Sequence, residues 1–436
     1  MTRHLLRLIW NRKGQNLLIV VEILLSFIVL FGVLLFTVNY ANNWRQPLGF
    51  DVDRAWSIRV SYPTTNRTRS VDHDPAETAQ LSRTFRELFR ALSALPNVES
   101  SAGAWPSVPY LNSTWGSGLG LEGGRRVNTV ANSVTDDFDD VLGVKLLAGR
   151  WFSRADDAAA WQPVVINQRL ARELFGDRDP VNQMIPFSDE YMEKSDVLKK
   201  PTRVVGVVED FRHLGEFSRP DNFLFRRLRL EDTELTAGFS GSLAGANFGG
   251  YGAPSVLVIR VTSGTTAAFE ETLVKSLQAV ARDWSFDVRP AVDMRTDQLR
   301  SYATPLAIFG TVAGFLLLMV FLGLTGVVWQ SVTRRTQEFG LRRAQGASIS
   351  SVRRQILAEI SLLTSVAVGV GTALVAQLPL LRLSLIANRQ APPPPEVFAT
   401  SIAVSAAVIY GLTLLCSWYP SRLATKIQPA EALHYE

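Results

Sequence analysis

The sequence predicts an α-helical membrane protein with four transmembrane helices and a large α+β extracytoplasmic domain of two lobes. The first observation is composition: the 436 residues are 47% hydrophobic with a mean hydropathy of +0.10, between a globular and a fully membrane-embedded chain. The second is a set of four long apolar runs, one before and three after a polar stretch. The third is that strand-like and helix-like periodicities alternate along this polar stretch, residues 40–304.

Transmembrane helices are expected at residues 17–39, 305–329, 355–381 and 397–419. At about 1.5 Å per residue, each run is long enough as a helix to cross a hydrocarbon layer about 30 Å thick. The first run is longer than the apolar part of a secretory signal and is followed by no small-x-small cleavage site. We therefore expect it to be retained as an anchor.

Basic residues predict the orientation of these helices. Residues 1–16 and 330–354 together carry ten basic residues and one acid, whereas the loop 382–396 carries two basic residues. Because cytoplasmic flanks are enriched in Lys and Arg, both termini, including the tail 420–436, are expected in the cytoplasm, and residues 40–304 on the other side. The first of these segments contains "HLLRLIW", a pattern typical of an amphipathic helix at the membrane interface.

The charge and cysteine content of residues 40–304 limit the function classes. These residues carry 31 basic and 34 acidic side chains, so the overall charge of +5 reflects membrane topology, and no nucleic-acid partner is expected. The single cysteine, Cys416, falls in the last apolar run. The outer domain therefore has no disulfide and must be held together by its core.

Residues 40–304 begin and end with the same order of elements. A strand, an amphipathic helix and a second strand are expected at 56–62, 81–92 and 98–105, and again at 255–261, 269–280 and 286–290. A hairpin across Gly123 and Gly124 joins strands expected at 119–121 and 127–134. Two strand–helix–strand halves predict a ferredoxin-like, porter-type lobe, formed by residues 55–134 and 255–292.

An inserted lobe is expected at residues 135–252. Its predicted elements are a short helix in "TDDFDDVLG", a strand in "VVIN", a helix in "QRLARELFG" and a buried strand in "RVVGVVEDF". The lobe ends in a glycine-rich stretch, 237–252, which lacks the Gly-Lys-Ser/Thr ending of a phosphate-binding loop. We interpret this stretch as a mobile loop in which Phe239, Phe248 and Tyr251 are candidate contacts to a partner.

The densest acidic cluster comprises Asp136, Asp137, Asp139 and Asp140. A cation site is one hypothesis, but the spacing lacks the alternating acids and terminal Glu of a calcium loop. A helix that Thr135 caps and Gly143 ends, with acids in its first turn, explains more of the pattern. No two of the four histidines have ligand-like spacing, so no metal site is predicted.

No motif for catalysis or cofactor binding stands out. The chain has no Gly-x-Ser-x-Gly elbow, and its one thiol lies in an apolar run, so a non-catalytic protein that binds no cofactor is expected. No Walker A sequence is present, and ATP, if used, is bound by another polypeptide. Inside the apolar runs, Glu22 and the Gly-x-x-x-Gly pair Gly310 and Gly314 are candidates for helix packing or dimer contacts.

One stretch combines charge with apolar residues beside a membrane helix. Residues 334–348 read "RRTQEFGLRRAQGAS", which resembles the "ERxxEIGxRRAxGAs" signature of MacB/FtsX-type ABC transporter permeases. The ending "YPSRLATKIQPAEALHYE" resembles that family's C-terminus. In the outer domain, "FDDVLGVKLLAGRWFSRADD", "VVINQRLARELFGDRDPVNQMI" and "VVGVVEDFR" are similar to the MacB-type periplasmic core.

The resemblance implies a permease subunit of the cell inner membrane with its large domain in the periplasm. It implies as partners a cytoplasmic ABC ATPase, which holds the ATP and Mg, a second permease copy or paralogue, and often a periplasmic adaptor. The implied function is to couple ATP hydrolysis to movement of the periplasmic domain, for efflux or extraction of a substrate. The alternative is an FtsX-like transducer that regulates a cell-wall enzyme.

On the basis of this resemblance, residues 336–344 are expected to form a coupling helix that docks on the ATPase. Phe339 and Leu341 are the predicted apolar anchors, next to Gly340. Glu338, Arg342 and Arg343 are expected to set the orientation of the helix through their charges. Arginines that serve only as a topology signal are the competing explanation, but they would not require Phe339 and its neighbouring glycines.

Overall fold

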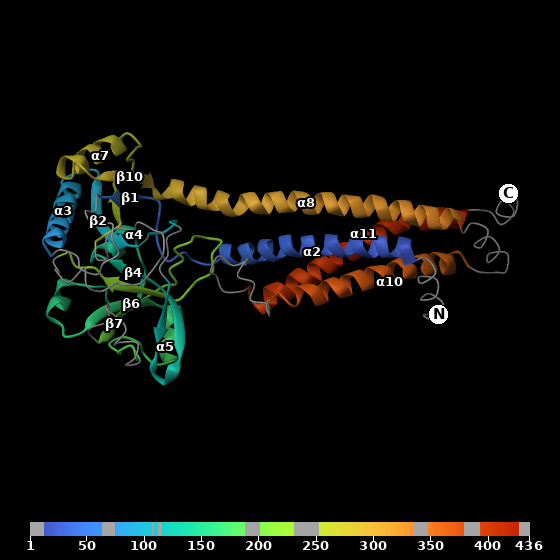
Figure 1. Ribbon diagram of the computed structural model, residues 1–436, viewed down its shortest axis with the longest axis horizontal. Helices are drawn as coiled ribbons and strands as arrows, with labels where there is room; N and C mark the ends of the chain where they lie inside the picture. The colour runs from blue at the N-terminus through green and yellow to red at the C-terminus, as the bar shows by residue number, and fades with distance from the viewer. Residues whose placement is uncertain are drawn as a thin grey trace. The chain divides into compact units, whose positions relative to one another are not determined.

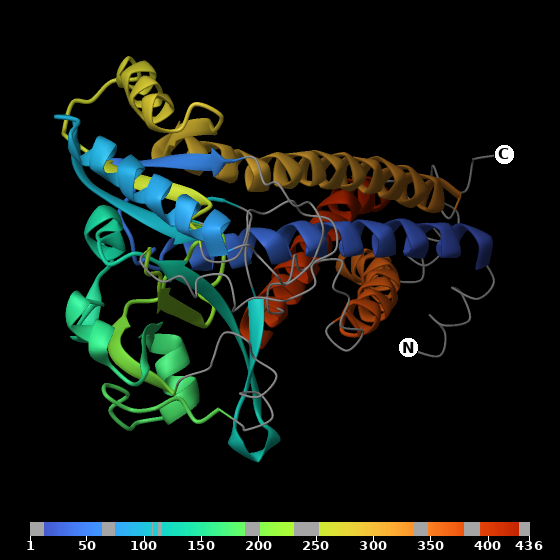
Figure 2. The same ribbon diagram turned by 60° about the vertical axis from the view of Figure 1, so that its left-hand side comes forward.

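A computed structural model describes residues 13–62, 75–106, 108–111, 116–187, 201–230, 253–334, 348–378 and 393–426 (Figures 1 and 2). The chain divides into two compact units, and each is described by itself. One comprises Met1–Asn42 with Ser301–Glu436 and contains most of the long helices. The other, Asn43–Arg300, contains the strands and is called the outer domain below.

Four of the helices within the described ranges are long and apolar enough to cross a membrane. They are α2 (Lys13–Trp44), α8 (Ala291–Arg334), α10 (Ile349–Val375) and α11 (Pro395–Lys426). The prediction of four membrane helices is confirmed. Helices α2 and α8 extend beyond the apolar runs at their outer-domain ends, and the division between the two units falls inside both helices.

Helix α2 contacts each of the other three membrane helices. Its Phe31 ring meets Phe398 of α11 edge-on, with 5.1 Å between ring centroids. Two glycines provide the space for its other contacts. A Cβ on Gly371 of α10 would collide with the ring of Phe27, and a Cβ on Gly323 of α8 would lie 3.0 Å from the Glu22 carboxylate. Small residues thus let large α2 side chains approach the neighbouring backbones.

Helix α11 buries several small polar side chains, and one hydrogen bond joins it to α10. Ser401, Ser405, Thr413 and Ser417 of α11 are all buried, and their hydroxyl groups donate to backbone carbonyls about one turn earlier. The hydroxyl groups of Ser365 and Tyr410 form a direct hydrogen bond of 2.7 Å between the two helices. Internal hydrogen bonding of this kind satisfies polar groups where no water is available.

The strands of the outer domain form one ten-stranded sheet. Its main path has the order β10-β1-β9-β2-β4-β8-β6-β7-β5, and β3 pairs with β4 off this path. The strands are β1 (Ala55–Ser61), β2 (Val98–Trp105), β3 (Gly116–Gly120), β4 (Arg126–Val134), β5 (Leu146–Gly149), β6 (Gln162–Asn167), β7 (Thr202–Val208), β8 (Phe223–Arg227), β9 (Val256–Val261) and β10 (Ser285–Pro290).

The ferredoxin-like lobe is built from β1-α3-β2 and β9-α7-β10, with helices α3 (Pro75–Ser93) and α7 (Phe269–Val280). Its strands lie in the order β10-β1-β9-β2, and every neighbouring pair is antiparallel. Both helices lie beside this part of the sheet (Figure 1). They share a core with it, in which Leu88 of α3 and Leu273 of α7 pack with Ile58. This arrangement confirms the predicted split α+β architecture.

The opposite face of the same strands is also covered. Strand β9 alternates between two cores: Leu257 and Ile259 face α3 and α7, whereas Val256 and Val258 belong to the core that contains helix α4 (Phe138–Leu142). A strand buried on both faces has a nearly continuous apolar sequence, which "VLVIRV" shows. A buried aromatic cluster of Phe211, Phe223 and Phe225 completes this second core.

The inserted part continues the sheet through β4. The end of β4 pairs with β2, and the same strand runs parallel to β8. Helix α5 (Gln168–Phe175) packs with β6 and β7 in a core of its own. Strands β5 and β8 were not predicted, because they are only four and five residues long. The two short 3₁₀ turns are η1 (Glu122–Gly124), at the tip of the β3–β4 hairpin (Figure 2), and η2 (Arg154–Ala158).

Gly149 at the end of β5 is required by a close backbone approach. It has φ of 73°, and a Cβ there would lie well inside 3.0 Å of the carbonyl oxygen of Val205 in β7. We expect Gly149→Ala to lower the free energy of unfolding of the full chain by roughly 2–4 kcal/mol, from strain in the β5–β7 pairing. Gly176→Ala is the matched control, since Gly176 also has positive φ but no atom within 4 Å of a Cβ. Equal losses of stability for the two variants, measured by thermal unfolding in detergent, would contradict the role of the close approach.

Candidate functional site

The predicted coupling residues Glu338, Phe339, Gly340, Leu341, Arg342 and Arg343 lie outside the described residues. The structure describes what brackets them. Helix α8 ends at Arg334, and α10 begins after Ser348, whose hydroxyl group accepts a hydrogen bond from the amide of Ser351 (3.3 Å). Residues 335–347, which include these predicted coupling residues, are called the coupling stretch below. In the sequence they connect two membrane helices, α8 and α10.

A cation–π contact lies near the start of α10. The guanidinium carbon of Arg353 is 3.8 Å from the ring centroid of Trp418, in the last part of α11. Such contacts contribute about 0.5–1 kcal/mol at exposed sites and more where water is excluded. It joins α10 to α11 a few residues from the coupling stretch.

The residues predicted for helix packing lie in different surroundings. Glu22 lies against Gly323 of α8, as described above. Gly310 and Gly314 have no neighbouring atom within 4 Å of a Cβ position, so within this chain they mediate no helix contact among the described residues. Helix α8 is the least buried of the four membrane helices, and it has a long exposed apolar face on a different side from these two glycines. Its large side chains include Ile308, Val312, Phe315, Met319 and Leu322.

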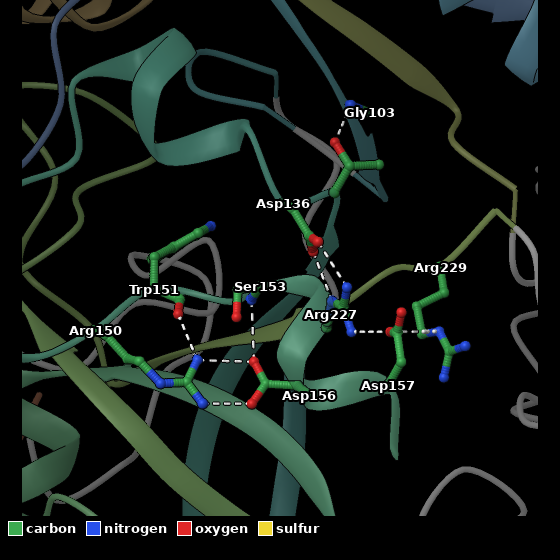
Figure 3. A network of polar contacts seen from close by, with 10 residues as sticks. Gly103, Asp136, Arg150, Trp151, Ser153, Asp156, Asp157, Arg227 and Arg229 are labelled. Carbon is green, nitrogen blue, oxygen red and sulfur yellow. Dashed lines mark hydrogen bonds and ion pairs between the residues drawn. The ribbon is translucent and has the colours of Figure 1, made fainter. Parts of the chain in front are cut away.

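One residue of the acidic cluster, Asp136, belongs to an ion-pair network (Figure 3). Asp136 accepts two hydrogen bonds from Arg227 at the end of β8, both of 2.6 Å. Arg227 is nearly buried, and its hydrogen bonds with Asp136 raise its pKa. Among the residues described, no three His, Cys, Asp or Glu side chains are grouped so that they could hold a metal ion.

The predicted capping of α4, the helix in the acidic cluster, was wrong in one respect. The Thr135 hydroxyl does not cap α4, because it accepts a hydrogen bond of 2.9 Å from the amide of Gly103 in β2 instead. Asp137 occupies the N-cap position and makes no capping hydrogen bond with its side chain. Gly143 ends the helix in the left-handed conformation, as predicted. Burial, with Asp140 nearby, raises the pKa of Asp139 to about 6.

The network continues from Arg227 into the 3₁₀ turn η2 (Figure 3). Arg227 also donates to Asp157 (2.5 Å), which lies 3.3 Å from Arg229. Next to Asp157, Asp156 is buried and pairs with Arg150. The network thus joins β8, the connection between β4 and α4, and η2, all within the inserted part of the outer domain. Residue spacing could not reveal it, because its members are up to 91 positions apart.

A second polar group lies in the loop after β7. His213 is fully buried against the ring of Phe223, and desolvation lowers its pKa to about 4. It therefore remains neutral at pH 7. The adjacent Arg212 is also buried, and burial lowers its pKa as well. Sequence reasoning assigned no role to either residue, since single charged residues after a strand resemble an exposed loop.

These features define a class of protein: a membrane protein in which a large α+β domain is inserted between the first and second of four apolar helices. Two family models match the chain in the same order. Residues 20–276 match the MacB-like periplasmic core domain, and residues 310–429 match the FtsX-like permease C-terminal domain. The chain belongs to the MacB/FtsX-type family of ABC transporter permeases, which confirms the resemblance seen in the sequence.

Two proteins similar to this chain differ in how much of their own length the match covers. The macrolide export ATP-binding/permease protein MacB of Bdellovibrio bacteriovorus is 25% identical over 352 residues, which cover 79% of this chain and 48% of that protein. The uncharacterized ABC transporter permease YknZ of Bacillus subtilis is 24% identical over 318 residues, which cover 71% of this chain and 70% of that protein. The chain spans about half the length of the MacB proteins it matches.

Two of the solved structures similar to this chain are extracytoplasmic domains of transporters. The periplasmic region of MacB from Actinobacillus actinomycetemcomitans is matched with a TM-score of 0.35 and 16% identity, over 57% of this chain and 93% of that one. The extracellular domain of the transporter YknZ from Gram-positive bacteria is matched with a TM-score of 0.32 and 12% identity, over 53% of this chain and 99% of that one.

The ion-pair network around Arg227 makes a prediction about stability. Asp136→Asn is expected to lower the free energy of unfolding by about 1.5–3 kcal/mol, because Arg227 stays buried after it loses a charge-assisted partner. Asp140→Asn, an exposed acid four positions along, is the control and should have little effect. Chemical denaturation of the full chain in detergent measures both. Equal effects of the two substitutions would show that general charge reduction, not the ion pair, is responsible.

His213 makes a prediction about pH. Its pKa is lower in the folded state, so between about pH 6.5 and pH 4 the unfolded chain binds a proton that the folded chain does not, and stability falls as pH falls. This loss should reach roughly 2 kcal/mol at pH 5. His213→Phe is expected to reduce the difference in melting temperature between pH 7.5 and pH 5. His73→Phe controls for the loss of a histidine elsewhere in the outer domain, and an unchanged pH dependence in His213→Phe would refute the assignment.

Proposed function

We propose that this chain is the permease subunit of an ABC transporter in which a separate cytoplasmic ATPase drives movement of the outer domain. The observation that carries the proposal is the family membership of both parts of the chain, in order, with the outer domain inserted between the first two membrane helices. The movement would serve export or extraction of a substrate on the periplasmic side. The chain would bind no nucleotide itself, and ATP and Mg would be held by the ATPase.

The continuity of α8 supports a mechanical role. This helix runs without interruption from Ala291 to Arg334 (Figure 1). Ala291 and Met294 in its first turn belong to the core of the outer domain, and its last residue directly precedes the coupling stretch. A force applied at the coupling stretch would therefore reach the outer domain through one secondary-structure element. Pro305 lies inside this helix and lacks a backbone N–H, so it provides a point where α8 can bend.

The exposed face of α8 supports a second permease copy or paralogue as a partner. Ile308, Val312, Phe315, Met319 and Leu322 recur at intervals of four and three residues, the spacing of a helix–helix seam. Gly310 and Gly314 lie on another side of the helix, since a helix has 3.6 residues per turn, and they would belong to a separate contact with a partner. An inner-membrane location with both termini in the cytoplasm and the outer domain in the periplasm fits this assembly, with an adaptor as a further partner.

Phe339 provides the test of ATPase coupling. Phe339→Ala should weaken association with the ATPase by about 2 kcal/mol, roughly 30-fold in Kd, because an aromatic anchor is lost while membrane insertion is unaffected. Gln337→Ala, two positions away, is the matched control. Affinity purification from native membranes followed by mass spectrometry and by ATPase assay measures the effect, and the chain alone should hydrolyse no ATP.

The same purification distinguishes the two roles considered. An ATPase recovered with an adaptor supports export or extraction, whereas an ATPase recovered with a cell-wall hydrolase supports the alternative of a transducer. Equal recovery of the ATPase with Phe339→Ala and Gln337→Ala would count against docking through Phe339. Nucleotide hydrolysis by the chain purified without partners would overturn the proposed function.

A further inference from the structure

The loop after β7 bonds to both connections of the outer domain with the rest of the chain. This loop, residues 209–219, is called the clamp loop below. All the contacts described here lie within the unit Asn43–Arg300. On one side the loop contacts the end of α2 and the residues that follow it, and on the other side it contacts the first two turns of α8. These two segments are more than 240 positions apart in the sequence.

Arg212 binds the chain that leaves α2. Its side chain is 1% exposed, and its guanidinium group donates to the carbonyl oxygen of Gln46 (2.7 Å) and, within the clamp loop, to those of Ser218 (2.6 Å) and Glu216. Its backbone amide donates to the carbonyl oxygen of Leu48 (2.9 Å). A planar guanidinium with several donors in fixed positions defines the relative placement of the carbonyl groups around it.

The end of α2 itself is also bonded to the clamp loop. The Asn43 side-chain amide donates to the carbonyl oxygen of Phe217 (2.8 Å), and Asn43 is buried. The ring of Trp44 packs on the ring of Phe217, with 5.4 Å between centroids. A directional hydrogen bond and a ring contact at adjacent positions therefore hold the last turn of α2 to the clamp loop.

Glu216 binds the start of α8. Its carboxylate, 7% exposed, accepts a hydrogen bond from Nε of Arg295 in α8 and one of 3.4 Å from the Tyr110 hydroxyl. One turn further along α8, the Gln298 side-chain amide donates to the carbonyl oxygen of Leu214 (3.5 Å). Burial and the negative charge of Glu216 raise the pKa of Tyr110, so its hydroxyl remains a donor at all physiological pH values.

We propose that the clamp loop is a coupling element that holds the end of α2 and the start of α8 together, so that these two helix ends move as one body. The role in coupling rests on the proposed function, whereas the holding of the two helix ends does not. Arg212 and Glu216 are its positioning residues. If α2 and α8 could separate at this point, force carried by α8 would be lost in deforming the connections of the domain instead of moving it.

The nature of the bonds distinguishes a clamp from an ordinary loop in the core. The clamp loop could be packed by apolar side chains alone, and buried polar groups rarely exceed such packing in stability. Directional bonds to the carbonyl groups of Gln46 and Leu48, and to Arg295, instead define one geometry. A purely stabilising loop predicts that variants lower the melting temperature without changing the relative motion of the two helix ends.

Two substitutions test the clamp in the full chain reconstituted in nanodiscs. Glu216→Gln keeps the size of the side chain and an acceptor for Tyr110 but removes the negative charge that pairs with Arg295, and so weakens the bond between them. Arg212→Gln removes the bonds to Gln46 and is the more disruptive variant. Asp297→Asn is the matched control, because it breaks the exposed pair of Asp297 with Arg289 two positions from Arg295.

The first measurement is hydrogen exchange followed by mass spectrometry. Loss of a charge-assisted hydrogen bond should raise the population of the opened clamp loop, and with it amide exchange at Arg212 and Tyr110, by about 10- to 100-fold. Asp297→Asn should leave these rates unchanged. If Arg212→Gln does not fold, Glu216→Gln alone decides the result. Equal exchange in Glu216→Gln and Asp297→Asn would overturn the clamp.

The second measurement follows the two helix ends by pulsed electron spin resonance. Spin labels are attached to Arg45→Cys and Asp293→Cys, both exposed positions, in a chain that also carries Cys416→Ser. One narrow distance distribution is expected, and Glu216→Gln should broaden it. An unchanged width in Glu216→Gln would overturn the clamp whether or not an ATPase is present.

The ATPase complex separates the two proposals. With the ATPase bound, the unmodified chain should keep its narrow distance distribution with and without ATP, whereas Glu216→Gln should show a nucleotide-dependent change and retain ATPase activity. A nucleotide-dependent change between the labels in the otherwise unmodified chain would overturn the clamp. Failure of any ATPase to bind would overturn the proposed function and the coupling role, and the width measured without ATPase would still decide whether the two helix ends are held.

Discussion

The outer domain depends on one geometric constraint: the two segments that connect it to the rest of the chain must lie next to each other. The domain is inserted between α2 and α8, so its first and last segments are far apart in the sequence and must still meet. The buried guanidinium of Arg212 meets this constraint on one side through the carbonyl groups of Gln46 and Ser218. Glu216 meets it on the other side through Arg295. A single loop thus closes the domain, and the ferredoxin-like order of strands, which places β1 between β10 and β9, is consistent with that closure.

The two lobes of the outer domain are likewise connected by few backbone pairings. Strand β4 pairs with β2 through two residues at its end and with β8 over residues 130–134, so the lobes share one sheet but only a short stretch of ladder between them. Arg227 stands at this place, with Asp136 and Asp157 on either side. The two lobes are also held together by a shared apolar core, in which Val256 and Val258 of β9 pack with Phe211, Phe223 and Phe225. Of the acidic cluster that resembled a cation site, Asp136 is therefore the residue that takes part in the ion-pair network.

The sequence predicted the helices and most strands because their signals are local. The apolar runs, the alternation at Trp56, Ile58 and Val60, and the stripe that includes Leu88 and Leu92 each record burial of one face of one element. Strand β5 escaped prediction because four residues are too few to establish a period. The role of Thr135 was misassigned because its hydroxyl bonds to Gly103, 32 positions away, and no capping pattern encodes such a partner. The clamp loop and the ion-pair network around Arg227 were missed for the same reason, since their members come together only when the sheet is assembled.

Buried charge has a specific consequence at these two places. An apolar core such as that around Ile58 tolerates small shifts, because dispersion contacts are numerous and weakly directional. The guanidinium of Arg212 tolerates little, because each displaced carbonyl group leaves a buried donor unsatisfied. Apolar packing therefore makes each lobe stable, and the charged groups determine how its parts are joined. If the outer domain is moved as proposed, its motion is restricted at the places that carry Arg212 and Arg227, and it is left to elements without such groups, such as α8 at Pro305.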